Sequence, residues 1–169
     1  MKYRMIGAAV VSFVLIIIGV VCWLIFTPHY LVAESFSIPD GDNVLVTVGG
    51  KTENVRLLHI DAPEYNQPYG YQAKEFARVY TKGKKIKIKH WNKRDPYGRL
   101  LGIAILDDGT ILNQVLVQEG FAWWYRYFSS DKSYEKLESN AKRYRRGLWI
   151  QDSPTPPWEW RRRNNVSGW

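Results

Sequence analysis

The sequence predicts an α+β fold, a small closed β-barrel with helices, preceded by one apolar N-terminal segment. Three observations lead to this prediction. The chain has 169 residues, which is enough for one domain and little more. Four short stretches between residues 44 and 106 have the composition and alternation of strands, and most of the helical pattern comes after them. A parallel α/β sheet would need strands and helices to alternate regularly, so a barrel is favoured.

The first predicted element is a membrane anchor over residues 6–26, which contain no charged side chain. As a helix this segment would be about 31 Å long at about 1.5 Å per residue, enough to cross a bilayer core of about 30 Å. Lys2 and Arg4 precede the segment, and the next Lys or Arg is Lys51. The positive-inside rule then leaves residues 1–5 in the cytoplasm and places the rest of the chain outside it, in a single-pass cell-membrane protein.

Two alternatives to an uncleaved anchor stay open. A cleaved signal peptide would usually have a shorter apolar region and end in a small-residue site of the A-x-A kind, and no such site follows Phe26. Lipid modification of Cys22 is the second alternative, and the large Val21 before it argues against cleavage there. Cys22 is the single cysteine of the chain, so no internal disulfide can form.

After a linker over residues 27–34, residues 35–151 are expected to form one compact unit. Its predicted strands are VLVTV, NVRLLHI, KIKIKHW and LLGIAIL, at 44–48, 54–60, 85–91 and 100–106. The glycine pair at 49–50 separates the first two strands. The last two are joined by DPYG at 95–98, where the aspartate opens a turn and the proline presets the next backbone angle.

Three helices are expected within this unit. The first covers about 68–80, and the second is ILNQVLVQEG, entered through Thr110 as N-cap and left at Gly120. The third is indicated by a single apolar face, made by Tyr134, Leu137, Ala141, Tyr144 and Leu148. The remaining residues, 152–169, are rich in Pro, Trp and Arg, and we expect this tail to be extended or only loosely docked.

The charge balance suits a polyanionic partner such as nucleic acid or anionic lipid. The chain has 24 Lys and Arg against 16 Asp and Glu, a formal net charge of +8. Aromatic side chains make up 15% of the residues, and those among positive charges could stack on bases, although most should be core. The basic tail at 161–163 could itself be a lipid or polyanion patch.

Four clusters of polar residues can carry chemistry. They are Asp40 and Asp42 around a glycine, Asp61 and Glu64 across a proline, Arg56 inside an apolar strand, and Arg99 after the DPYG turn. Taken singly, each has a plain structural explanation as a turn former, a solvated acid, a salt bridge or an exposed hairpin residue. A buried guanidinium, however, needs an acid or an anionic ligand beside it.

Taken together, these residues are what metal-assisted cleavage of a phosphodiester requires. Carboxylate oxygens from Asp42 and Asp61 suit a hard cation, and Ca²⁺ accepts irregular geometry and backbone carbonyls better than Mg²⁺ does. A cation and two arginines would stabilise the crowded charge of the transition state. Glu64 would then act as the base that activates water. The histidines are too scattered, with Cys22 in the apolar segment, for a zinc site.

Six stretches together resemble the staphylococcal nuclease (thermonuclease) family. They are IPDGDNV, VRLLHIDAPE, YGYQAKEFA, DPYGR, NQVLVQEGFAW and AKRYRRGLW, in that order within residues 36–150. The later PPWEWR is similar to tails of bacterial members. The resemblance implies a five-stranded Greek-key barrel of OB type with three helices. It also implies Ca²⁺-dependent cleavage of DNA and RNA at the P–O5′ bond, leaving 3′-phosphates.

The resemblance also implies roles for single residues. The metal ligands would be the Asp42 and Asp61 carboxylates and the backbone carbonyl of Ala62, where the family often has Thr. The catalytic residues would be Glu64 as general base and Arg56 and Arg99 as phosphate-binding arginines, while Asp40 would support the metal ligands. Tyr97 would lie close to the bound nucleotide, and the stacking role could belong to Tyr125, to Tyr127 or to neither.

One departure from the family lies in the loop after Glu64, YNQPYGY, which is shorter than in the best-known member and could change how substrate enters. The main alternative function is a non-catalytic, membrane-tethered module of OB type that binds nucleic acid without cutting it. All five catalytic and metal-binding side chains are present, which favours the enzyme. We expect it to be a monomer.

Overall fold

The computed structural model describes residues 13–23 and 27–164. Residues 13–23 are helical and exposed. Within the described residues, no helix combines the length and the apolar character that crossing a membrane requires. The expected anchor over 6–26 extends into undescribed residues at both ends, and the expected cytoplasmic residues 1–5 lie wholly outside the description.

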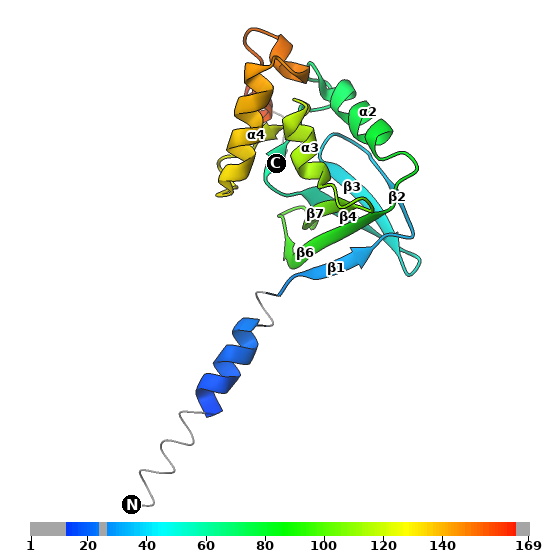
Figure 1. Cartoon of the computed structure of the whole chain (residues 1–169), viewed down its shortest axis with the longest axis vertical. Coiled ribbons are helices and arrows are strands. Elements are labelled where there is room, and N and C mark those ends of the chain that lie inside the picture. The colour runs from blue at the N-terminus through cyan, green and yellow to red at the C-terminus, as the bar shows by residue number, and fades with distance from the viewer. Residues whose placement is uncertain (1–12, 24–26, 165–169) are drawn as a thin grey trace, which may run out of the picture.

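The rest of the chain forms two sheets and a set of helices grouped at one end of the larger sheet (Figure 1). The strands are β1 (His29–Val32), β2 (Ser35–Ser37), β3 (Asn43–Val48), β4 (Lys51–Leu57), β5 (Ile60–Asp61), β6 (Ile86–Arg94), β7 (Leu100–Leu106) and β8 (Trp123–Trp124). The helices are α2 (Gly70–Tyr80), α3 (Leu112–Gln118), α4 (Lys132–Arg143), the 3₁₀ helix η1 (Gly147–Ile150) and α5 (Pro157–Arg163).

The larger sheet has six strands in the order β1-β6-β7-β4-β3-β2, and β5 pairs with β8 in a small second sheet. All neighbours in the larger sheet are antiparallel except β4 and β7. This barrel-like α+β arrangement agrees with the predicted fold class, but the sheet has one strand more than the five expected. Two strands of this sheet, β1 and β2, were not among the stretches located in the sequence. β1 lies inside residues 27–34, the segment expected to be a linker.

The four predicted strands are all present, with one important difference. β7 coincides with the predicted stretch 100–106, and its alternate residues are buried. The predicted strand 54–60, in contrast, ends at Leu57 and resumes as β5. His59 lies between them with a φ of 72°, a left-handed conformation that turns the chain away from the first sheet. β5 pairs with β8 instead, through Asp61 opposite Trp123.

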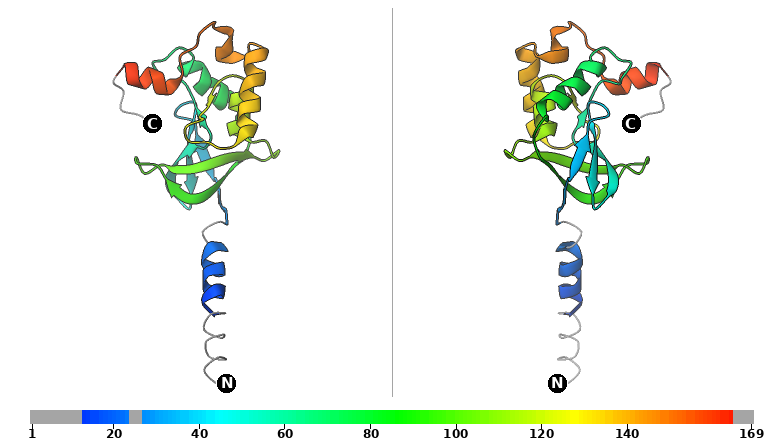
Figure 2. Two further views of the ribbon diagram at one scale, coloured as in Figure 1. Left: turned by 90° about the vertical axis from the view of Figure 1, so that its left-hand side faces the viewer. Right: turned by 90° about the vertical axis from the view of Figure 1, so that its right-hand side faces the viewer.

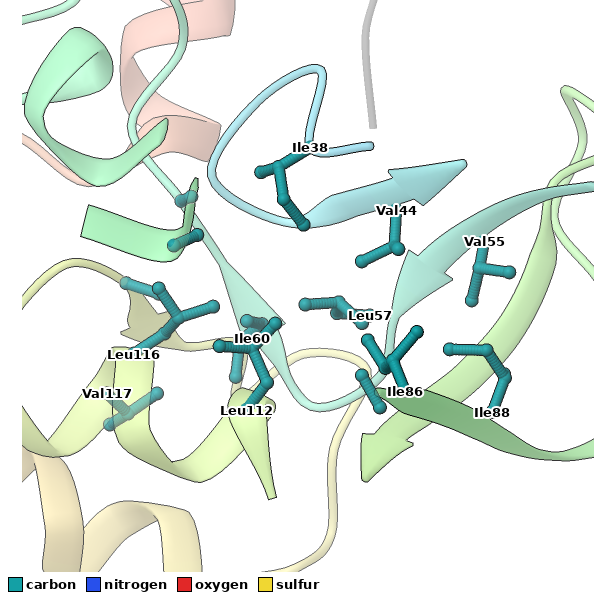
Figure 3. Packing of buried hydrophobic residues seen from close by; sticks show 14 of the residues in the cluster. Ile38, Val44, Val55, Leu57, Ile60, Ile86, Ile88, Leu112, Leu116 and Val117 are labelled. Atoms are coloured by element: carbon teal, nitrogen blue, oxygen red, sulfur yellow. The ribbon is translucent and has the colours of Figure 1, made fainter. Parts of the chain in front are cut away.

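The hydrophobic core fills the space between the sheet and the helices (Figure 3). Alternate side chains of the strands, such as Val44, Val55 and Ile88, are fully buried. Leu112 and Leu116 of α3 pack against them from the helical end. Burying such side chains contributes about 1.5–3 kcal/mol each, so the chain holds its fold by packing without a disulfide.

The helices depart from prediction at their ends. α3 begins after Ile111 and not through a side-chain cap from Thr110. α4 has the cap that the sequence analysis missed, because the Asp131 side chain accepts a hydrogen bond from the Ser133 amide at 2.9 Å. Of the predicted apolar face, Leu148 lies beyond α4, in η1.

The expectation of an extended or loosely docked tail is wrong for residues 157–163. Residues 157–163 form the helix α5, which lies at the same end of the barrel as α4 but on the opposite side (Figure 2). Its first residue is Pro157, which suits the first turn of a helix because its missing N–H would have no partner there. Pro157 and Arg161 are both buried, so the helix is docked.

Candidate active site

Arg56 is the buried centre of the site. It lies in β4 opposite Asn43 of β3, and only 6% of its surface is exposed. Its Nη1 donates to the carbonyl oxygens of Leu57 and Ile60, at 2.8 and 2.9 Å. The guanidinium therefore fastens the turn around His59, which explains why the sequence places an arginine inside an apolar strand.

The same guanidinium contacts two of the predicted metal ligands. Arg56 Nη2 lies 2.8 Å from Asp61 Oδ1 and 3.2 Å from Asp42 Oδ2. Asp61 is 1% exposed and Asp42 is 7% exposed, so these charges lie in a low-dielectric environment. The Ala62 amide also donates to Asp42 Oδ2 at 2.6 Å, which joins the two acidic loops.

The acidic loops enclose a hollow of about 120 Å³. Its lining residues are Asp40, Gly41, Asp42, Asn43, Asp61, Ala62, Pro63, Glu64 and Tyr65. Asp40 holds the first loop in shape by accepting hydrogen bonds from the backbone amides of Asp42 and Asn43, at 3.1 and 2.8 Å. The arrangement thus brings together all four predicted acids.

The electrostatics of this hollow favour a cation. Burial raises the pKa of Asp42 to about 7, Arg56 opposes this rise, and the charges of Asp40 and Asp61 add to it. Among the described residues no three His, Cys, Asp or Glu side chains form a complete metal site. Two carboxylates and the Ala62 carbonyl would fit Ca²⁺, which uses backbone and water oxygens as well as carboxylates.

Arg99 is positioned by the turn that the sequence predicted. Asp95 Oδ1 accepts from the amides of Tyr97 and Arg99, and Asp95 Oδ2 lies 2.6 Å from Arg99 Nε. Arg99 Nη1 then reaches across to Asn43 Oδ1 at 3.2 Å. Since Asn43 adjoins Asp42, the hairpin arginine is linked directly to the acidic loop.

Arg56 and Arg99 both line a larger, mainly apolar pocket of about 330 Å³. Its other lining residues are Leu57, Leu58, His59, Ile60, Arg94, Asp95, Pro96, Leu101, Tyr125 and Phe128. An apolar pocket lined also by three arginines, Arg56, Arg94 and Arg99, can accept a flat base and an attached phosphate. The pocket and the acidic hollow are joined through the Arg56–Asp61 pair.

The three predicted nucleotide-binding tyrosines have different surroundings. Tyr97 is 55% exposed with the Arg99 guanidinium 5.5 Å from its ring centre, and Tyr127 is 64% exposed. Tyr125 lines the pocket, and its ring stacks on Trp158 of α5 at 5.6 Å. Tyr125 is therefore partly covered by the C-terminal helix.

Arg161 of α5 is the site residue that the sequence analysis missed. Its Nη2 lies 2.9 Å from Asp61 Oδ2, and its Nη1 lies 2.7 Å from Glu64 Oε1. One signal could have indicated the helix, namely Pro157 followed by Glu159 in the first turn and basic residues in the last. The contact between Arg161 and acids about 100 positions earlier has no local signal.

The comparison with protein families gives a match over residues 54–151 to the family described as staphylococcal nuclease homologue. The chain belongs to the staphylococcal nuclease family. It is 35% identical over 164 residues to a micrococcal nuclease of Shigella flexneri, with 91% of each chain covered. It is also 38% identical to an uncharacterized endonuclease of Escherichia coli O157:H7, over 73% of this chain and 80% of that one.

Membership of the staphylococcal nuclease family and the names of these relatives support nuclease activity, the hydrolysis of phosphodiester bonds in nucleic acid. The match begins within β4 and ends just after η1, so it includes Arg56, Asp61, Glu64 and Arg99. Asp42 lies before it and Arg161 after it. Both nevertheless contact Asp61 or its neighbours.

Proposed function

We propose that this chain is a Ca²⁺-dependent nuclease that hydrolyses DNA and RNA at the P–O5′ bond and leaves 3′-phosphates. One observation carries the proposal: Arg56 and Arg99 line the same pocket, which adjoins a hollow formed by Asp42, Asp61 and Glu64. Two cations for a phosphate, two metal-binding carboxylates and a base thus occur in one place.

In the proposed mechanism, Asp42, Asp61 and the Ala62 carbonyl would hold the metal. When bound, Ca²⁺ would supply positive charge that stabilises the negative charge of the reacting phosphate. Arg99 binds a non-bridging phosphate oxygen. Arg56, whose terminal nitrogens already contact protein oxygens, favours through its positive charge the transition state, in which the charge on the phosphate oxygens is greatest. Tyr97 and Tyr127 are exposed surfaces on which bases can stack.

Glu64 is the proposed general base. Its carboxylate takes a proton from a water molecule whose oxygen forms the new bond to phosphorus, while the P–O5′ bond breaks. The departing 5′ oxygen takes a proton from water and becomes a hydroxyl, and the phosphate remains on the 3′ side. The Glu64 amide donates to the Gln67 side chain at 3.1 Å, and the Gln67 amide donates to the Glu64 carbonyl at 2.9 Å, which holds the base in place.

The experiment is digestion of labelled DNA and RNA by the full chain with Ca²⁺ or with a chelator, followed by mass spectrometry of the product ends. We expect chelator-sensitive cleavage with 3′-phosphate ends. Glu64→Gln should lower kcat by roughly 10²–10⁴-fold while the protein stays folded. Binding without cleavage would instead support the non-catalytic module, and cleavage in the chelator would refute the role of the metal.

We further propose that residues 6–26 hold the enzyme at the cell membrane with its nuclease domain outside the cytoplasm. The support is the uncharged segment and the basic residues Lys2 and Arg4 before it. Protease added to intact spheroplasts should digest the nuclease domain, and the shortened remnant should stay with the membrane fraction. Protection of the domain until the cells are lysed would refute this orientation.

A further inference from the structure

We infer that Arg161 is a third arginine of the active site, a positioning residue that holds Asp61 and Glu64 in their reactive arrangement. The C-terminal helix α5 would then be part of the catalytic unit. This inference rests on the proposed function, because it concerns the proposed metal ligand and the proposed base. The contacts of the Arg161 side chain support this inference.

The Arg161 guanidinium bridges the two carboxylates. Nη1 lies 3.2 Å from Asp61 Oδ1 and 2.7 Å from Glu64 Oε1, and Nη2 lies 2.9 Å from Asp61 Oδ2. Both oxygens of Asp61 are thus engaged by the planar fork, which fixes the plane of that carboxylate as well as its position. An ammonium group would supply the charge without this geometry.

The helix that carries Arg161 is docked through two of its tryptophans. Trp158, three positions earlier, stacks on Tyr125 at 5.6 Å and meets Trp123 edge-on at 5.7 Å. Trp160 Nε1 donates to Asn66 Oδ1 at 3.3 Å. These contacts fix α5 against β8 and against the loop that follows Glu64.

A second connection lies just before the helix. Gln67 Nε2 donates to the Thr155 carbonyl at 2.6 Å, and the Gln67 side-chain oxygen accepts from the Glu64 amide. One side chain thus joins the backbone of the proposed base to the segment that carries Arg161. The base and the arginine are connected both through their side chains and through the supporting backbone.

Arg161 and its partner Asp61 are both buried, so their charges must be paired within the protein. Arg161 is 5% exposed, and Asp61 is 1% exposed. A buried guanidinium is tolerated only where its charge is matched, and here two carboxylates match it. Arg56 contacts Asp61 as well, so this carboxylate is paired with two arginines, one from β4 and one from α5.

Arg161 leaves the acidic hollow open. Among the described residues, the hollow is lined by two short segments, 40–43 and 61–65, and Arg161 is not one of its lining residues. The guanidinium therefore contacts the carboxylates without filling the space proposed for the cation. This geometry favours a positioning role over that of a plug that must leave before catalysis.

The test compares Arg161→Ala and Arg161→Lys with Arg162→Ala, a matched control on the same helix whose side chain is exposed. In the full chain at saturating Ca²⁺, we expect Arg161→Ala to lower kcat by roughly 10–100-fold, with KM for DNA changed less than about threefold. Arg161→Lys should recover only part of the loss. Arg162→Ala should stay within about twofold of the unmodified chain.

Two further measurements separate positioning from a merely structural role. Guanidinium ion at millimolar concentration should raise the rate of Arg161→Ala but not that of Arg162→Ala. Calorimetric titration should show Ca²⁺ binding to Arg161→Ala at unchanged or higher affinity, since a positive charge beside Asp61 has been removed. Circular dichroism and thermal melting give the folded fraction used to normalise each rate.

Three results would overturn the inference. The first is a kcat of Arg161→Ala within twofold of that of the unmodified chain. The second is a higher kcat, which would mean that Arg161 inhibits the enzyme. The third is a loss of activity explained wholly by weaker Ca²⁺ binding or by unfolding. An unmodified chain without Ca²⁺-dependent cleavage would refute the proposed function. The failure of the two proposals can therefore be told apart.

Discussion

Gly70 offers a sharp test of how closely the proposed base must be positioned. It is the first residue of α2, and its amide donates to the Gln67 carbonyl at 2.9 Å. A Cβ added at Gly70 would lie 1.8 Å from the carbonyl oxygen of Glu64 and 2.7 Å from its carbonyl carbon. Both are backbone atoms, so no side-chain rotation can relieve the clash.

The size of the effect of Gly70→Ala follows from these distances. Real Cβ contacts essentially never fall below 3.0 Å, so the Glu64 backbone and the helix must separate by about 1.2 Å. A misplacement of about 1 Å can cost about 10²-fold in rate when a reacting group is involved. We therefore expect kcat to fall by about 10²-fold. The same overpacking should lower the free energy of unfolding by about 1–3 kcal/mol.

The assay measures kcat at saturating Ca²⁺ and DNA, together with urea unfolding. Gly102→Ala is the matched control, because its added Cβ would lie 2.6 Å from Ile88 Cγ2 and 3.0 Å from Val55 Cγ1. Those methyl groups can move, and they lie in the core of the barrel. Both variants should lose stability, but only Gly70→Ala should lose kcat. An equal kcat in the two variants would refute the argument that the Glu64 backbone position controls the rate.

Three further predictions concern the charged groups. Arg56→Lys should lower kcat by about 10²–10³-fold. It should also lower the free energy of unfolding in urea by about 1–3 kcal/mol, because the Leu57 and Ile60 carbonyls lose their donors. Near-normal values of both would show that Arg56 neither stabilises the transition state nor holds the turn. Asp42→Asn should weaken the stabilisation of the protein by Ca²⁺ in thermal melting, because a charged metal ligand is removed. A Ca²⁺-induced rise in melting temperature that is unchanged in this variant would exclude Asp42 as a ligand. Burial lowers the pKa of His59 below its ordinary 6.5, so the stability that its neutral form gives the fold is complete above pH 6.5 and is lost as the pH falls from 6.5 toward the lowered pKa. His59→Gln should therefore reduce the fall in the free energy of unfolding over that pH range, and an unchanged pH dependence would contradict this.

The sequence predicted those parts of the fold whose signals are local. The alternation in β7 and the Asp-Pro turn before it needed only neighbouring residues, and both are present. β1 could not be predicted in this way. His29–Val32 has no distinctive alternation, and it is a strand because β6, about 60 positions later, offers it a pairing edge.

The candidate site divides in the same way. The sequence indicated Arg56, Asp61 and Glu64, and the structure brings them together, although their catalytic roles stay predictions. Arg161 was missed because a Pro-rich lead-in suggested an extended tail and because its partners are distant in sequence. A buried arginine can be predicted only when the acids that pair with it are known. The acids that pair with Arg161 are brought beside it by the fold and are not its neighbours in the sequence.

The two predicted phosphate-binding arginines differ in a way that bears on the mechanism. The Arg56 side chain is 7% exposed, and its two terminal nitrogens already contact carbonyl and carboxylate oxygens. The Arg99 side chain is 16% exposed and projects from a hairpin beside the exposed Tyr97. An arriving phosphate should therefore meet Arg99 first. Arg56, fixed between the turn carbonyls and Asp61, is better placed to stabilise charge that develops close to the metal ligands, because it needs no reorganisation as the reaction proceeds.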